Sequence, residues 1–413
     1  MLRLDGHGYS PALFCQIIEL SGKLKSFQQA EIALAVLAGL DISSRHINRL
    51  AREVGAELAQ ARDAKTTKRR RRELKPQVAN VPSLAVVELD GGRLLTRQPG
   101  QGPGVHQVQP KEDKIACLMT MQGVSHEQDP QPEPPPAFLD LPRVARLTQR
   151  LHGHSAGPAQ AQPQPEDKAE GAEATEEGQA EPWRGAPKRL VRTCVATMQN
   201  SKAFGPMVAA EAQERNLYAA ARRAYLGDGQ QYNWTIQRGY FPDFEAINDF
   251  VHVVAYLYLV GWLVGGALGL DEKERQKQYE GWLGMSWQGR VEGVIEEMAG
   301  WQERLGRPPP GEELAETDPR RVLQETLTYL RNNKGRMDYP RYRQQGLPVT
   351  SSLVESLVGE FNYRVKGKDK YWDRPEGAEA ILQVRAAVLS QDDRLAKHFA
   401  TRPGNPYRRK PRD

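Results

Sequence analysis

Residues 83–92 read Ser-Leu-Ala-Val-Val-Glu-Leu-Asp-Gly-Gly, a short apolar run that ends in an acid and two glycines. This pattern is typical of a buried strand that stops at a turn. Residues 92–96 and 113–121 are also apolar enough to be strands, and we expect them to pair with the first. These three segments predict an antiparallel set of strands.

The strand pattern returns downstream of this set. Residues 190–198 predict a strand, and residues 204–219 predict a helix. Residues 224–229 form a second short apolar run, which leads into Asp228 and a glycine. Residues 350–400 predict two further helices. Strands and helices therefore alternate through much of the chain.

Residues 244–332 have a helical pattern, with four tryptophans available for its core: Trp262, Trp282, Trp287 and Trp301. Within this segment, residues 250–270 carry no formal charge, and their length alone would permit a membrane span. Acidic residues bound the stretch, and neither side has an excess of Lys or Arg. We therefore expect a buried helix and no membrane association, with a membrane protein as the alternative.

The N-terminal 75 residues predict helices separated by a short turn. Residues 28–38 and 45–58 have apolar residues at helical spacing, with Gly39 between them and Asp41 or Ser43 as a helix cap. Such a pair is compatible with a helix-turn-helix and with a plain helical hairpin. Residues 65–72 form the densest positive run, which could neutralise DNA phosphates or be a solvated linker.

The composition is that of a soluble protein with some low-complexity sequence. The 413 residues have a net charge of +5 and 26% charged residues. The three cysteines, Cys15, Cys117 and Cys194, form no paired motif, so a reducing cytoplasm fits and a disulfide framework does not. Residues 153–183 are rich in Ala, Gln, Pro and Glu, which predicts a disordered insertion.

Three acids are candidates for a metal-dependent phosphoryl-transfer site. Asp90 and Asp228 close apolar runs and precede glycine, and Glu355 begins a predicted helix. Magnesium prefers oxygen ligands, and two ions about 3.5–4 Å apart can activate an attacking oxygen and stabilise a leaving one. Acids from two neighbouring strands and one packing helix could converge on such ions. A strand-end Asp-Gly alone, however, is often only a turn, and Glu88 is a second acid on the same strand face as Asp90.

Sequence blocks around these acids follow a family pattern. Residues 226–234 (LGDGQQYNW), then Tyr240-Phe-Pro242 and Asp249-Phe-Val-His252, match a block that reads GDG, a tryptophan, FP and D-x-x-H. Residues 354–385, which contain Val354-Glu355-Ser356, Arg364-Val-Lys366-Gly367, Trp372 and Arg385, match a glutamate block. These two blocks resemble those of the Mutator-like and Kra-type insertion-sequence transposases. Residues 39–49 (GLDISSRHINR) match, more loosely, the region of these transposases that binds the ends of the DNA element.

The resemblance implies an α/β fold, an RNase H-like mixed sheet with an all-helical insertion, preceded by an N-terminal helical, helix-turn-helix-like domain. It implies a DDE transposase in which Asp90, Asp228 and Glu355 hold two Mg²⁺ or Mn²⁺ ions. Asp228 and Glu355 are 127 residues apart, which the helical insertion accounts for. Asp249 and His252 match the D-x-x-H element, and we expect them to support the site or touch DNA. Asp249 is also the main rival to Asp228, and a core histidine is the alternative for His252.

The implied domain organisation has five parts. They are residues 1–75, a DNA-binding domain; 80–235, the first part of the catalytic domain; 236–348, the helical insertion; 349–400, the C-terminal helices of the catalytic domain; and 401–413, a basic tail. The expected DNA-contacting residues are Arg45, Arg49, Lys68, Arg69, Arg70, Arg71, Arg72, Arg364, Lys366 and Lys368.

The expected partner is double-stranded DNA, as element ends and as target. A homo-oligomer is expected in the DNA complex because two ends must be paired, and the expected location is the cytoplasm, at the nucleoid when bound to DNA. The alternatives are a non-catalytic helix-turn-helix protein and an RNase H-like nuclease without strand transfer.

Overall fold

The computed structural model describes residues 8–97, 108–154, 183–350, 352–366, 372 and 375–402. Within them, the side chains of residues 93, 97, 108–110 and 352–358 are not described. The predicted disordered insertion at 153–183 and the predicted basic tail at 401–413 lie almost entirely outside the described residues.

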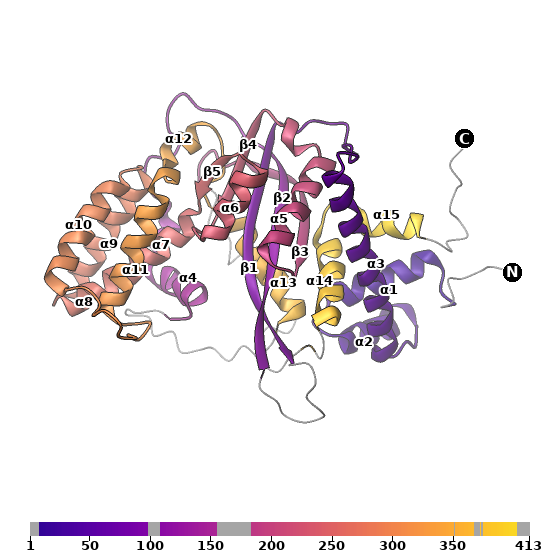
Figure 1. The fold of residues 1–413 in the computed structure, drawn as a ribbon. Helices are drawn as coiled ribbons and strands as arrows, with labels where there is room; N and C mark the ends of the chain where they lie inside the picture. The colour runs from indigo at the N-terminus through magenta and orange to yellow at the C-terminus, as the bar shows by residue number, and fades with distance from the viewer. Residues whose placement is uncertain are drawn as a thin grey trace.

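A mixed five-stranded sheet with the order β3-β2-β1-β4-β5 forms the centre of the fold (Figure 1). The strands are β1 (Leu84–Arg97), β2 (Val108–Gln122), β3 (Lys188–Thr197), β4 (Arg222–Gly227) and β5 (Glu245–Asn248). The first three strands pair antiparallel, whereas β4 is parallel to β1 and β5 is parallel to β4. The fold is therefore α/β with a mixed sheet, as predicted at that level.

The first strand is longer than predicted. The sequence predicted that a strand ends at Asp90 and that a separate one covers residues 92–96, and this was wrong: β1 continues through both glycines to Arg97. A Cβ added at Gly92 would lie 2.7 Å from the Asp113 carboxylate on β2, so this glycine permits a close approach between strands and does not form a turn.

Alternate side chains of β1 belong to two different cores, as the two-residue period of a strand requires. Ala85, Val87 and Leu89 pack with α5 (Ser201–Glu214) and α6 (Gln231–Tyr240). Leu84 and Val86 face the other side, where α13 (Ser352–Val365) and α14 (Pro375–Leu389) pack. Figure 1 shows α5 and α6 in front of the sheet and α13 behind it. Glu88 and Asp90 lie on this second face.

A helical insertion separates β5 from α13 and forms one end of the molecule (Figure 1). Its α-helices are α7 (Phe250–Leu259), α8 (Gly265–Ala267), α9 (Glu272–Trp287), α10 (Val291–Leu305), α11 (Pro319–Asn333) and α12 (Tyr339–Gln344). The four predicted core tryptophans are at most 9% exposed. The sequence missed β5, which lies inside the predicted insertion of 236–348, because four residues show too little periodicity.

The apolar helix that starts at Phe250 runs to Ala267 and includes a short π-helical segment, Val260–Val264. Among the described residues it is the single helix long and apolar enough to cross a membrane, and 72% of it is buried inside the protein. A core helix is expected to be mostly buried in this way.

Three helices form the N-terminal region: α1 (Pro11–Lys23), α2 (Phe27–Ala38) and α3 (Ser44–Arg70). Gly39 ends α2 in the left-handed conformation, and the Ser43 hydroxyl accepts a hydrogen bond from the His46 N–H at the start of α3. The helix α3 continues through most of the basic run, so the linker interpretation of that run was wrong. It packs on α14 and α5.

The remaining α-helices are α4 (Leu141–His152), which packs on α7, and α15 (Arg394–Thr401) near the C-terminus. Residues 350–400 thus contain three helices, where the sequence predicted two.

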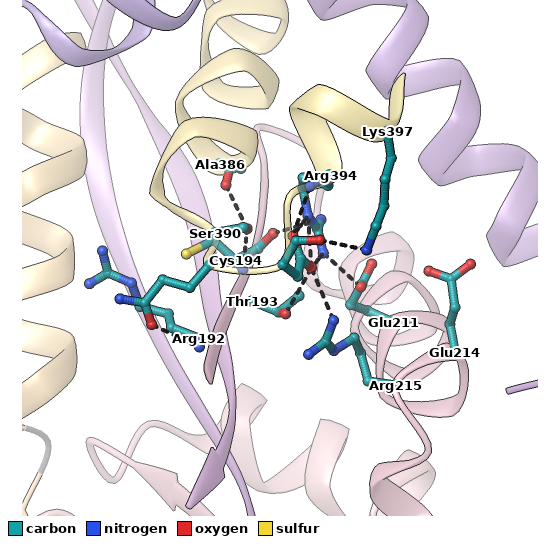
Figure 2. Close-up of polar contacts among 12 residues, drawn as sticks. Arg192, Thr193, Cys194, Glu211, Glu214, Arg215, Ala386, Ser390, Arg394 and Lys397 are labelled. Carbon is teal, nitrogen blue, oxygen red and sulfur yellow. Dashed lines mark hydrogen bonds and ion pairs between the residues drawn. The ribbon is translucent and has the colours of Figure 1, made fainter. Parts of the chain in front are cut away.

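A buried polar cluster joins the loop before α15 to β3 and α5 (Figure 2). Arg394 donates to Glu211 at 2.8 Å and to the Asp392 carboxylate at 2.6 Å. Thr193 of β3 donates to the same carboxylate at 3.0 Å. Asp392 is 9% exposed, so its charge depends on these partners for compensation.

We expect Asp392→Asn to remove acid-sensitive stability. Burial opposes ionisation of Asp392, but hydrogen bonds and the charge of Arg394 outweigh it and lower its pKa to about 2. A carboxyl whose pKa is lower in the folded state stabilises that state above its ordinary pKa, and the contribution disappears as the pH falls through the folded pKa. The variant should therefore lose about 2 kcal/mol near neutral pH and progressively less below about pH 4.

Urea unfolding across this pH range measures the difference, with the exposed neighbour Asp393→Asn as the control. A loss for Asp392→Asn that is independent of pH would contradict the assignment.

Candidate functional site

Asp90 lies on β1, and Asp228 directly follows β4, the neighbouring parallel strand. Glu88 of β1 pairs with Leu226 of β4. If this register is extended by two residues, Asp90 comes next to Asp228. Both aspartates line a cavity of about 450 Å³. Adjacent strands are about 4.8 Å apart, and the two carboxyls therefore form one acidic pair.

The turn after β4 orients Asp228. Its Oδ1 atom accepts hydrogen bonds from the Gln230 N–H at 2.9 Å and from the Asn233 side-chain amide at 2.7 Å. Gly229 has a φ of +94°, and a Cβ there would lie 2.3 Å from the Tyr329 ring. Only glycine fits this position, so the Gly-Asp-Gly sequence is explained by the turn that presents the carboxylate.

Burial raises the pKa of Asp90 to about 6. His252 opposes this effect, while the charges of Asp228 and Asp249 add to it. The carboxyl of Asp90 thus lies in a region with excess negative charge, which a cation or a donor would stabilise.

Asp249 and His252 lie next to Asp90 and Asp228 and line a small inner cavity with them. Asp249 is 2% exposed, caps α7 by accepting from the Val251 N–H at 3.1 Å, and donates its own N–H to the Gly227 carbonyl at 2.9 Å. The His252 Nε2 atom lies 3.7 Å from the Asp249 carboxylate, and His252 lines the cavity with Asp228. The D-x-x-H element therefore joins the start of α7 to the end of β4, next to the acids.

Glu88 contributes a fourth acid close to this group. It is 1% exposed, and neither carboxylate oxygen has a hydrogen-bond partner among the described residues. Burial, followed by the charge of Asp249, raises its pKa well above the ordinary range. Glu88 also lines an inner cavity of about 10 Å³, with Asp90, Asp228 and the D-x-x-H pair, which is space for about one water molecule.

Glu355 lies in α13, as predicted, but its side chain is outside the described residues. Gly359 and Asn362 of this helix, and Lys366 directly after it, line the cavity. Position 355 is four residues before Gly359, so helical spacing places it on the same stripe. Among the described residues no three His, Cys, Asp or Glu side chains are placed to hold one metal ion. The metal-binding role of Asp90, Asp228 and Glu355 therefore remains a prediction.

Cationic side chains also line this cavity: Lys114 of β2, Arg150 of α4 and Lys366 after α13. The Lys114 ammonium lies 2.9 Å from the Glu112 carboxylate and 5.5 Å from the centroid of the Tyr232 ring. The sequence predicted Lys366 only. It missed Lys114 and Arg150 because they come from segments that no motif marks.

The predicted DNA-contacting residues of α3 lie at its two ends. Arg45 and Arg49 are exposed near its start, and Arg49 donates to the His46 ring at 2.8 Å. At its other end Arg69 is half-buried, 5.8 Å from the centroid of the Tyr240 ring. The other four predicted contacts near this end, at or just after the end of α3, are exposed: Lys68, Arg70, Arg71 and Arg72.

Arg364 does not lie on the surface, and its assignment as a DNA contact was wrong. It is 1% exposed, donates to the Ser21 carbonyl at 2.7 Å, and stacks 4.3 Å from the centroid of the Phe27 ring. Its guanidinium therefore fixes α13 to the N-terminal helices. Lys368 lies outside the described residues.

A comparison with known proteins found no family model and no curated protein that matches this sequence.

Proposed function

We propose that this chain is a DNA transposase of the DDE type that cleaves and joins DNA at insertion-sequence ends. The observation that carries the proposal is that Asp90 of β1 and Asp228, which follows β4, line one cavity together with Lys114, Arg150 and Lys366. Carboxylates suit divalent cations and the surrounding cations suit phosphate, so the cavity has the two chemistries that phosphodiester transfer requires.

The architecture supports an RNase H-like assignment. The mixed sheet, the acid positions on β1 and after β4, and the helical insertion before α13 are compatible with the fold that the family resemblance implies. In this assignment α13 supplies the third acid, Glu355.

The donor set fits Mg²⁺ or Mn²⁺, which would be held by Asp90, Asp228 and Glu355. Bound ions of this kind activate the attacking oxygen and stabilise the leaving one. The chain itself positions the phosphodiester: Lys114, Arg150 and Lys366 balance charge on the phosphate. Hydrogen bonds from Gln230 and Asn233 fix the Asp228 carboxylate. The D-x-x-H pair keeps the ends of β4 and β5 in place.

A DNA substrate implies further contacts with the protein and more than one protein copy in the complex. Exposed Arg45, Arg49 and the basic end of α3 are positioned to contact DNA phosphates. Two element ends must be held for joining, so we propose a homo-oligomer in the DNA complex and a cytoplasmic protein that binds the nucleoid.

The test is cleavage of duplex DNA that carries the element's own ends, in Mg²⁺ or Mn²⁺, by wild type and by Glu355→Gln. We expect the variant to cleave at least about a hundredfold more slowly, because a ligand contributes several kcal/mol to transition-state stabilisation. The exposed Glu376→Gln on α14 is the control and should cleave at the wild-type rate.

Equal cleavage by wild type and Glu355→Gln would overturn the role of Glu355. A strand-transfer assay with the cleaved ends separates a transposase from a nuclease, since a nuclease would release ends without joining them. Cleavage that does not need a divalent ion would overturn the DDE mechanism.

A further inference from the structure

Asp113 is an acid that the mechanism above does not use. It lies on β2 directly opposite Gly92, while Asp90 lies opposite Ile115. Because side chains alternate along a strand, Asp113 is on the same sheet face as Asp90. It lines the 450 Å³ cavity together with Asp90 and Asp228, so the cavity has a further acid beyond the aspartate pair.

The Asp113 carboxylate is buried without a matching donor. The residue is 0% exposed, and neither oxygen has a hydrogen-bond partner from another described residue. Burial raises the pKa of Asp113 to about 6, although its own backbone N–H and the charges of Lys366 and Lys114 each lower it. An unpaired buried acceptor is costly, and a ligand that supplies a donor recovers that cost.

The local structure places this carboxylate in the wall of the cavity, packed against the backbone of β1. Gly92 has no side chain, and a Cβ there would collide with the Asp113 Oδ1 atom at 2.7 Å. A Cβ at Gly91 would lie 3.2 Å from the Asp113 carbonyl oxygen and 3.6 Å from the Tyr232 hydroxyl. The two glycines therefore allow Asp113 to lie close against β1, next to Asp90.

The chemistry of the carboxylate selects the class of group that can bind it. Phosphate oxygens are acceptors and would be repelled, whereas the exocyclic amino groups of DNA bases are donors that Asp and Glu accept. A base next to the reacting phosphate is therefore the ligand that fits best.

We propose that Asp113 accepts a hydrogen bond from the exocyclic amino group of a DNA base adjacent to the scissile phosphate. Asp113 is then a specificity-determining residue that favours an amino-bearing base over one with a carbonyl at that position. This inference rests on the proposed function, since it requires DNA in the cavity.

The test compares two single-stranded probes of equal length, oligodeoxycytidine and oligodeoxyuridine, which differ in the amino or carbonyl group at C4. Fluorescence anisotropy in Ca²⁺ measures their Kd values. We expect wild type to bind the cytidine probe about ten- to a hundredfold more tightly, the range for one good base contact. Asp113→Asn should lose most of this preference, because the amide can also donate to a carbonyl.

The neighbouring Glu112→Gln is the matched control. It removes the same charge one residue away on a side chain that is 66% exposed, so it should keep the preference for cytidine. Binding of the uridine probe by Asp113→Asn at least as tightly as by wild type shows that the variant is folded.

Equal binding of both probes by wild type, or an undiminished preference in Asp113→Asn, would overturn this inference and leave the proposed function standing. If wild type binds neither probe and no duplex DNA, the proposed function fails as well.

Discussion

Replacing Asp228 by asparagine is expected to slow metal-dependent DNA cleavage by about a thousandfold or more, with little change in folding or DNA affinity. Asparagine keeps the Oδ1 atom that accepts from Gln230 and Asn233, so the turn after β4 should persist. The substitution removes the negative charge and one good oxygen ligand, and the loss of several kcal/mol at the transition state corresponds to this factor. Single-turnover cleavage of labelled duplex DNA measures it.

Two further variants test whether the loss of cleavage is specific to Asp228. Asp243→Asn changes an exposed acid in the turn before β5 and should leave the cleavage rate unchanged. Asp249→Asn should have a smaller effect than Asp228→Asn, since an asparagine can still cap α7. If Asp249→Asn abolished cleavage and Asp228→Asn did not, Asp249 would be the second ligand.

Arg343→Ala is expected to lower the free energy of unfolding by about 3–5 kcal/mol, the usual cost of removing one partner from a buried ion pair. Arg343 is 0% exposed. Its guanidinium donates to both carboxylate oxygens of Asp129 and to the Trp287 carbonyl, and it lies 4.0 Å from the centroid of the Trp287 ring. Its loss would leave Asp129 without this partner and disconnect α12 from α9 and from the loop before α4.

Arg341→Ala is the matched control two residues away. Arg341 pairs with Glu245 and Asp338, but its side chain is 43% exposed, and exposed pairs are worth about 1 kcal/mol or less. Equilibrium unfolding in urea, monitored by tryptophan fluorescence, compares the two variants. Equal losses for both, or a larger loss for Arg341→Ala, would contradict the burial argument.

The aspartate pair was predictable because its signals are local. A short apolar run predicts a buried strand, and a Gly-Asp-Gly sequence after it predicts a turn that exposes a carboxylate. Both features depend on a few consecutive residues. The four buried tryptophans of the insertion were predictable for a similar reason, since large apolar side chains at helical spacing seldom remain in solvent.

The parts that were missed depend on contacts between distant segments. Pairing of residues 113–121 with the first strand was predicted, but nothing near Gly91 and Gly92 indicates the register of that pairing or a strand that continues to Arg97. Asp113 reaches the cavity only through that pairing, and Arg150 only because α4 packs on α7. Arg364 looks like any basic residue in the sequence, and it is buried because α1 and α2 cover it.

The length of α3 has a mechanical consequence. At 1.5 Å per residue, its 27 residues span roughly 40 Å, and it is a single unbroken helix that is held against α5 and α14. Under the proposed function, Arg45 at one end and Arg70 at the other belong to one rigid helix with no hinge. Their contacts with DNA would then be held roughly 40 Å apart, slightly more than one turn of duplex.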